Sequence, residues 1–475
     1  MLITEGYEKM IQAGFYECDI TPPYGADRPA DFRKRSIQKI SDPLKIRAMA
    51  LSDGNRKVAL VGIDNIGCGP GFLRTLQERL PGISVLFSAS HTHFGGNLRD
   101  KFPGIDEADA VIRRIVLDES VAHDANYYEF CLRQTVTAVT FAFEALQDVD
   151  FSFGSGRVEN LIFNRRIRMK DGSVKTHAGK GNPDAVDYAG PVDDQLGVMG
   201  VWKKETSELL GFAFNFSCHS CINLEGATSD YAGVAIETVR AVYGSGTGAV
   251  FMYGAAGDVT QIDNMSLKKD MGKPVCIKLG RAVGAEAIKI LATADRGPVE
   301  KLNLQSRVYH LRRNLPDPDE VKAAYEKIQV FEDSNDYKIA KTLVMSDLIA
   351  KSESKPETEL AVLQIGPLVI GSAPGEMFAQ FALDFKARSR FPFTWMASLS
   401  TERGYIPTAD AFDPVTGGGY EASTAEFVPE TGDEITGILS ELEHQLTPEK
   451  APESEKVQPK VSAWGYNFKR KNLAN

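Results

Sequence analysis

The chain has 475 residues, of which 43% are hydrophobic and 25% are charged. These proportions are typical of a globular protein and exclude a disordered, collagen-like or coiled-coil chain. The 54 lysines and arginines are outnumbered by 64 aspartates and glutamates, which gives a net charge of −10. This acidic balance argues against a general nucleic-acid-binding protein, because such proteins need a basic surface.

The sequence also bears on the cellular location. No run approaches the roughly 18 uninterrupted apolar residues of a membrane span. The first residues, MLITEGYEKMIQAG, carry glutamates and a lysine where a signal peptide has an apolar core. Six cysteines are too few for a disulfide scaffold. We therefore expect a cytoplasmic protein without a membrane span.

Strand-like and helix-like segments alternate between about residues 14 and 446. Apolar residues recur at steps of three and four in 126–146 and in 275–291, which predicts two helices. Short runs rich in β-forming residues predict buried strands. These runs cover residues 57–63, 83–89, 211–217, 249–254, 367–372 and 393–399.

Two further segments define the expected domain organisation. Residues 318–353 have the pattern of a helical hairpin with charged outer faces, which indicates an insertion. Residues 447–460 are rich in proline, glutamate and lysine, so we expect a mobile tether there. Beyond it, Trp464, Tyr466 and Phe468 alternate like a short docking strand. The sequence thus predicts one catalytic body over 1–446 and an extended tail over 447–475.

The histidines point to a metal site. Two of the seven lie in the motif SHTH, where His91 and His93 would face the same side of an extended backbone. His219, Asp258 and Glu376 each follow another predicted strand, Glu376 at the start of a predicted helix. Two histidines and a carboxylate are the ligands of a catalytic zinc ion that keeps one position open for water. A hydrogen-bonded structural histidine is the alternative for His219 taken alone.

Ten short motifs together resemble the neutral ceramidases, the neutral/alkaline non-lysosomal ceramidase-like hydrolases. They occur in the order found in that family, and they span most of the chain. The motifs are CDITPPYG (18–25), DPLKIRAMAL (42–51), SASHTHFGGN (88–97), FNRR (163–166), NFSCHS (215–220), SDYAG (229–233), GAAGDVT (254–260), APGEMF (373–378), GYIPT (404–408) and YEAS (420–423).

The resemblance implies a fold and a set of site residues. The fold is a single large α/β domain with an extensive mixed β-sheet covered by helices, like the N-terminal domain of the neutral ceramidases. The metal is Zn²⁺, and the side chains of His91, His219, Glu376 and Tyr405 hold it. The substrate pocket contains His93, Arg165 and Tyr420, which would orient a carbonyl and stabilise its oxyanion, with Asp258 and Thr260 near the cavity.

The chain also departs from the family. Thr260 stands where the family has a serine, and its methyl group makes it a more crowded nucleophile. This favours direct attack by zinc-bound water. The interval from Tyr405 to Tyr420 is longer than in the family. Residues 97–124 and 165–180 carry many arginines and lysines, which suit a polar or anionic ligand if they face the cavity and are otherwise a solvated surface.

The leading hypothesis is a zinc-dependent hydrolase in which a metal-bound hydroxide attacks the amide carbonyl of a small, polar N-acyl substrate. An esterase or lactonase, or a lyase acting on a polysaccharide or sugar acid, is the alternative on the same fold. A non-catalytic ligand-binding homologue is a further alternative. In each case we expect a small-molecule or glycan ligand and no nucleic acid, and the sequence leaves homo-oligomerisation open.

Overall fold

The computed structural model describes residues 10–29, 34–121 and 123–454. The predicted docking strand around Trp464, Tyr466 and Phe468 lies outside these ranges. None of the helices inside them combines the length and the apolar composition that a membrane crossing requires.

The largest element is a nine-stranded mixed sheet. Eight strands follow the order β14-β13-β12-β7-β1-β4-β5-β6, and β16 pairs with β7. The inner neighbours are antiparallel, whereas the pairs at the two ends, β13–β14 and β5–β6, are parallel. The strands are β1 (Gln12–Asp19), β4 (Lys45–Ser52), β5 (Lys57–Ile63), β6 (Ser84–Ala89), β7 (Gln147–Arg157), β12 (Gln195–Lys203), β13 (Leu209–Phe216), β14 (Gly248–Tyr253) and β16 (Arg296–Gly297).

A second sheet of four strands packs on one face of the first. Its order is β17 (Leu302–His310), β18 (Glu357–Ile365), β19 (Leu368–Ser372) and β21 (Phe393–Ala397). The two sheets bury a shared core, to which β12 contributes Met199 and Val201 and the second sheet contributes Leu363 and Trp395. Alternate residues of each strand point into this layer because side chains along a strand alternate between its faces.

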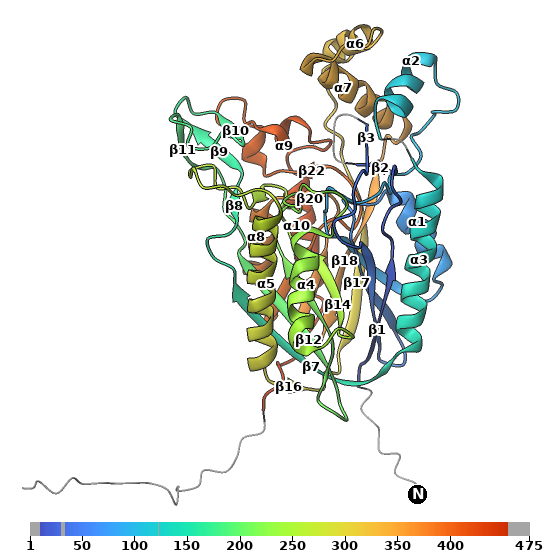
Figure 1. Ribbon diagram of the computed structural model, residues 1–475, viewed down its shortest axis with the longest axis vertical. Coiled ribbons are helices and arrows are strands. Elements are labelled where there is room, and N and C mark those ends of the chain that lie inside the picture. Colours follow the sequence, from blue (N-terminus) through green and yellow to red (C-terminus); the bar gives the residue numbers. More distant parts are fainter. Residues whose placement is uncertain (1–9, 30–33, 122, 455–475) are drawn as a thin grey trace, which may run out of the picture.

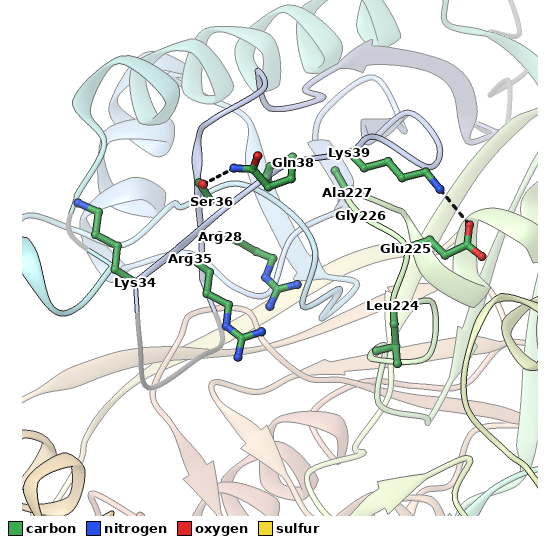
Figure 2. A pocket seen from close by; sticks show the side chains of 11 residues that line it. Arg28, Lys34, Arg35, Ser36, Gln38, Lys39, Leu224, Glu225, Gly226 and Ala227 are labelled. Atoms are coloured by element: carbon green, nitrogen blue, oxygen red, sulfur yellow. Dashed lines mark hydrogen bonds and ion pairs between the residues drawn. The ribbon is translucent and has the colours of Figure 1, made fainter. Parts of the chain in front are cut away.

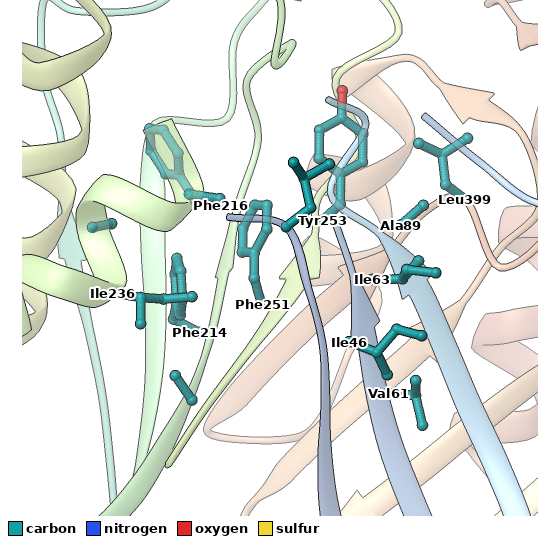
Figure 3. Close-up of a cluster of buried hydrophobic side chains, with 14 of the residues drawn as sticks. Ile46, Val61, Ile63, Ala89, Phe214, Phe216, Ile236, Phe251, Tyr253 and Leu399 are labelled. Carbon is teal, nitrogen blue, oxygen red and sulfur yellow. The ribbon is translucent and has the colours of Figure 1, made fainter. Parts of the chain in front are cut away.

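Helices cover the outer faces of both sheets (Figure 1). The nine-stranded sheet carries α1 (Pro70–Arg79), α3 (Ala125–Glu144), α4 (Asp230–Tyr243) and α5 (Lys273–Thr293), and α8 (Ala379–Arg388) and α10 (Thr431–Glu443) cover the smaller sheet. Figure 3 shows part of the first helix–sheet core, where Ile236 of α4 lies beside Phe214 of β13. The predicted α/β fold, an extensive mixed sheet covered by helices, is therefore confirmed. The predicted strands and helices end within two residues of the observed ones.

A small helical unit stands beyond one end of the sheets (Figure 1). Residues 318–353 form α6 (Pro318–Lys327) and α7 (Asn335–Ser352), which pack against α2 (Ala110–Arg113) and the π-helix η1 (Arg114–Asp118). The unit has its own apolar core, built from Ile112, Ile115, Ala324, Ile328, Tyr337 and Val344.

Whereas β16 lies at the opposite end of the molecule, most of the two- to four-residue elements gather at the same end as the helical unit (Figure 1). The loops that follow β6, β13 and β14 open there, and these loops carry the residues singled out in the sequence. The short elements are β2 (Asp27–Arg28), β3 (Arg35–Ser36), β8 (Phe163–Asn164), β9 (Arg166–Met169), β10 (Val174–Thr176), β11 (Ala185–Tyr188), β15 (Val259–Thr260), β20 (Glu376–Met377), β22 (Tyr405–Ile406), η2 (Ala409–Phe412) and α9 (Tyr420–Ser423).

Candidate metal centre

Two histidines are fixed by backbone carbonyl groups at the ends of separate strands. His91 follows β6, and its Nδ1 lies 2.8 Å from the carbonyl oxygen of Ile66. His219 follows β13, and its Nδ1 lies 3.0 Å from the carbonyl oxygen of Ala256. A carbonyl oxygen only accepts, so each Nδ1 carries the hydrogen and donates it. In a neutral imidazole this leaves Nε2 as an acceptor with a free lone pair, the form that binds a metal.

The two Nε2 atoms face each other at 3.1 Å. His93 adds a third ring nitrogen, 3.3 Å from Nε2 of His91, and the ligand atoms of all three histidines lie within 4.8 Å of one another. Two lone pairs repel at this distance unless a cation or a proton lies between them. Two nitrogens on a tetrahedral zinc ion with bonds of about 2.1 Å would be roughly 3.4 Å apart. The cluster therefore fits a metal ion.

The carboxylate of Glu376 lies beside the histidine nitrogens and adds a further metal-binding atom. Oε2 of Glu376 lies 3.2 Å from Nε2 of His91 and 3.5 Å from Nε2 of His219. This oxygen is buried and has no hydrogen-bond partner among the residues that the structure describes. Glu376 was expected at the start of a helix, but it lies in β20 and the helix begins at Ala379. The two-residue strand holds the carboxylate against the histidines.

Tyr405 reaches the same place through strand pairing. It is the register partner of Glu376 in the parallel pair β20–β22. Burial, and next the charge of Glu376, raise the pKa of the Tyr405 phenol well above its usual value. The guanidinium of Arg165 lies 5.4 Å from the centre of its ring. The structure thus brings His91, His219, Glu376 and Tyr405 to one site.

The imidazoles of His93 and His219 are held neutral. Burial lowers the pKa of both rings well below the usual histidine value. For His219 the next cause is the positive charge of Arg165, and for His93 it is the neighbouring His91. The backbone of His91 has a φ of +62°, a left-handed conformation that costs a non-glycine residue energy. The backbone at His91 is therefore locally strained, and this conformation directs the His91 ring toward His219.

Arg165 is the cation of the site, and it has a buried counter-ion. Its Nη1 lies 3.3 Å from Nε2 of His219. Its Nε donates to Oε1 of Glu421 at 2.6 Å, and the Glu421 side chain is completely buried. Glu421 was not among the predicted site residues, although it lies inside the YEAS motif next to Tyr420. The hydroxyl of Thr176 donates to the other oxygen of Glu421, so the carboxylate is fixed from two sides.

The fold is that of solved ceramidases. A structure described as ceramidase complexed with C2 superimposes with a TM-score of 0.67 at 17% identity, over 94% of this chain and 77% of the other. The neutral ceramidase from Pseudomonas aeruginosa superimposes with a TM-score of 0.67 at 18% identity, over 94% and 76%. The chain has the neutral ceramidase fold. No family model matches the sequence, and no curated protein matches it. The resemblance seen in the motifs is thereby confirmed for the fold.

Asp258, which was expected near the cavity, has a side chain that contacts the start of α8. Its carboxylate accepts from the backbone N–H of Ala379 at 2.9 Å and from the side-chain amide of Asn164 at 2.6 Å. Burial raises its pKa to about 6, and these hydrogen bonds only partly oppose the rise. Asp258 thus fixes the start of α8, close to Glu376. No described contact joins its side chain to the histidines.

Thr260 and Tyr420 differ in their exposure to solvent. The Thr260 hydroxyl contacts its own loop, 3.2 Å from Oε1 of Gln261 and 3.3 Å from the N–H of Ile262, and the residue is 1% exposed. Tyr420 is 41% exposed, and its ring meets that of Tyr405 edge-on at 5.6 Å. Tyr420 therefore lies at the edge of the site, whereas the Thr260 hydroxyl is enclosed.

Proposed function

We propose that the protein is a zinc-dependent hydrolase that cleaves the amide bond of a small, polar N-acyl substrate. The observation that carries this proposal is the pair of carbonyl-anchored histidines whose Nε2 atoms face each other at 3.1 Å beside the carboxylate of Glu376. The neutral ceramidase fold supports amide hydrolysis as the reaction class. When bound, zinc lowers the pKa of a water ligand to about 7 and so supplies a nucleophile at neutral pH.

The roles of the protein groups follow from their positions. His91, His219, Glu376 and Tyr405 hold the metal, and His93 is close enough to replace Tyr405 as the fourth ligand. The guanidinium of Arg165 donates hydrogen bonds to the carbonyl oxygen of the substrate as negative charge develops on it. Glu421 keeps this guanidinium in place.

Two further groups would act on the substrate. His93 is neutral and partly exposed, so its ring would accept a proton from the attacking water and pass that proton to the leaving nitrogen. Tyr420, exposed beside Tyr405, contacts the substrate at the edge. Thr260 takes no nucleophilic role in this mechanism because its hydroxyl is enclosed.

The test compares two histidine variants of the full chain. We expect about one zinc ion per chain in the wild type, and loss of both zinc and N-acyl amide hydrolysis in His91→Ala. The control is His310→Ala, because the side chain of His310 on β17 is 72% exposed and should not affect either measurement. Undiminished turnover by metal-free His91→Ala protein would refute the assignment.

The same experiment separates the alternatives. Ester or lactone hydrolysis without amide hydrolysis would keep the site and change the bond that is cleaved. An unsaturated product absorbing in the near ultraviolet would identify a lyase acting on a sugar acid or glycan. Ligand binding without turnover in the zinc-loaded protein would identify a binding homologue. A cytoplasmic location stays a prediction.

A further inference from the structure

The helical unit is attached to the body through two connections that meet in a cluster of charged side chains. Arg313 lies in the connection between β17 and α6, and Glu353 lies directly after α7. Nη2 of Arg313 donates to a carboxylate oxygen of Glu353 at 3.1 Å, and Nε donates to the Glu353 carbonyl oxygen at 3.2 Å. Nη1 of Arg313 donates to Glu426 at 3.0 Å. The two connections are therefore bonded to each other and to the segment after α9.

Arg403 joins this cluster from the loop that leads to Tyr405. Its Nη1 and Nη2 donate to the two carboxylate oxygens of Glu353 at 2.8 and 3.1 Å, and Nη2 also donates to the carbonyl oxygen of Glu357 at 2.8 Å. The side chains of Arg403 and Arg313 are each 7% exposed. A two-point contact of this kind fixes the orientation of a guanidinium as well as its position. Glu353 thus holds the loop at Arg403.

The residues that follow Arg403 belong to the metal centre. The carbonyl oxygen of Gly404 accepts from the N–H of Glu376 at 2.8 Å, and Tyr405 is the register partner of Glu376. The side chain of Glu426 lies 3.9 Å from the position that a Cβ atom of Gly404 would take. The charged cluster therefore packs around the peptide that aligns Glu376 with Tyr405.

Glu353 is unfavourably placed for the helix that it ends. It is the C-cap residue of α7, where the helix dipole disfavours a negative charge. A residue that opposes a local preference is expected where it serves a purpose elsewhere in the structure. The two guanidinium groups that converge on this carboxylate supply such a purpose, because they need a buried counter-ion.

We propose that Glu353 is a positioning residue of the metal centre. Through Arg403 it fixes the segment 404–405, and this segment in turn fixes the backbone of Glu376. The end of the helical unit is then a part of the metal site. The inference rests on the proposed function for the presence of a metal ion, but it does not depend on which bond is cleaved.

The test compares zinc affinity with thermal stability in the full chain. Competition with a chromophoric chelator gives the zinc affinity, and thermal unfolding is followed on the metal-free protein. We expect Glu353→Gln and Arg403→Gln each to bind zinc about tenfold more weakly, as for other residues that support metal ligands. The double variant should bind zinc no more weakly than the worse single variant, because both changes remove the same contact.

Glu17→Gln is the matched control. Like Glu353, the carboxylate of Glu17 lies between two arginines, 2.7 Å from Arg240 on α4 and 3.6 Å from Arg47 on β4. Its side chain is 31% exposed, against 39% for Glu353. This variant should lower the melting temperature as Glu353→Gln does, but leave the zinc affinity unchanged.

Three results would overturn the proposal: unchanged zinc affinity in Glu353→Gln, additive losses in the double variant, or equally weak zinc binding in Glu17→Gln. The last result would mean that lost stability alone weakens the metal site. A wild type that binds zinc but hydrolyses no N-acyl amide would refute the proposed reaction and leave the role of Glu353 standing. A wild type that binds no zinc would overturn both.

Discussion

The histidine cluster and the surface pocket lined by Arg28, residues 34–39 and residues 224–227 (Figure 2) are built in opposite ways. At the cluster, the side chains of Arg165 and Glu421 are 7% and 0% exposed and form one ion pair. At the pocket, those of Lys39 and Glu225 are 62% and 44% exposed. A buried charge depends strongly on its partner, whereas solvent screens an exposed pair. Substitutions at the cluster should therefore affect stability and turnover, whereas substitutions of the exposed pair at the pocket should change stability little.

The largest effect is expected from Glu421→Gln. This change leaves the Arg165 guanidinium buried without its counter-ion, which costs about 3–5 kcal/mol of folding free energy in comparable buried pairs. We also expect kcat to fall because the guanidinium is no longer held beside His219. Denaturant unfolding and steady-state kinetics measure the two effects.

The control for Glu421→Gln is Glu441→Gln. Glu441 pairs with Arg307 at 2.7 Å, but both side chains are well exposed, at 64% and 42%. This variant should unfold within about 1 kcal/mol of the wild type. If the two glutamine variants were equally stable, the contrast between buried and exposed pairs would be wrong. In the Glu421→Gln background, Arg165→Met should cost little further stability because the unpaired charge is removed.

The second effect is a pH dependence caused by Asp258. Its pKa is raised to about 6 in the folded protein from 3.8, so the folded state binds this proton more tightly than the unfolded state. The resulting stabilisation is complete below pH 3.8 and is lost as the pH rises through 6. The loss is about 3 kcal/mol, since one pKa unit corresponds to about 1.4 kcal/mol.

Asp258→Asn isolates this contribution because asparagine does not titrate. The stability of the variant relative to the wild type should improve by about 2 kcal/mol between pH 4 and pH 7, because the proton is already partly bound in the unfolded state at pH 4. Urea unfolding at both pH values gives the difference. A constant difference between the two proteins would mean that Asp258 does not change its protonation over this range.

A smaller effect is expected from Gly257→Ala. A Cβ atom there would lie 2.4 Å from the carbonyl oxygen of Glu376, so β20 must shift. We expect a loss of about 1–3 kcal/mol in stability, and about tenfold weaker zinc binding, as for other residues that support ligands. Gly246→Ala is the matched control, because nothing lies within 4 Å of its Cβ position. Equal zinc affinity in both variants would contradict the role of β20.

The fold was predictable where local patterns determine it. The apolar run at 57–63 and the period of 126–146 are properties of neighbouring residues, and they became β5 and α3. The order of the strands was not predictable, because pairing joins residues far apart in sequence. Ala13 of β1, for example, pairs with Gln147 of β7. Such partners leave no periodic signal in one sequence.

The same distinction between local motifs and long-range pairs applies to the site residues. His91 and Glu376 were identified because their motifs are contiguous, and the structure brings them together. The ion pair of Arg165 and Glu421 was missed because it joins residues 256 positions apart. Long-range electrostatic pairs could therefore be identified only from the structure.

The smallest effect is expected at the rim of the pocket, from Lys39→Gln. The variant loses one ion pair of 3.3 Å between two largely exposed side chains. Such pairs contribute about 0–1 kcal/mol, so unfolding should be almost unchanged. A loss of stability as large as that of Glu421→Gln would show that the pair of Lys39 and Glu225 is as important for folding as the buried pair. The contrast between the buried and the exposed region would then be wrong.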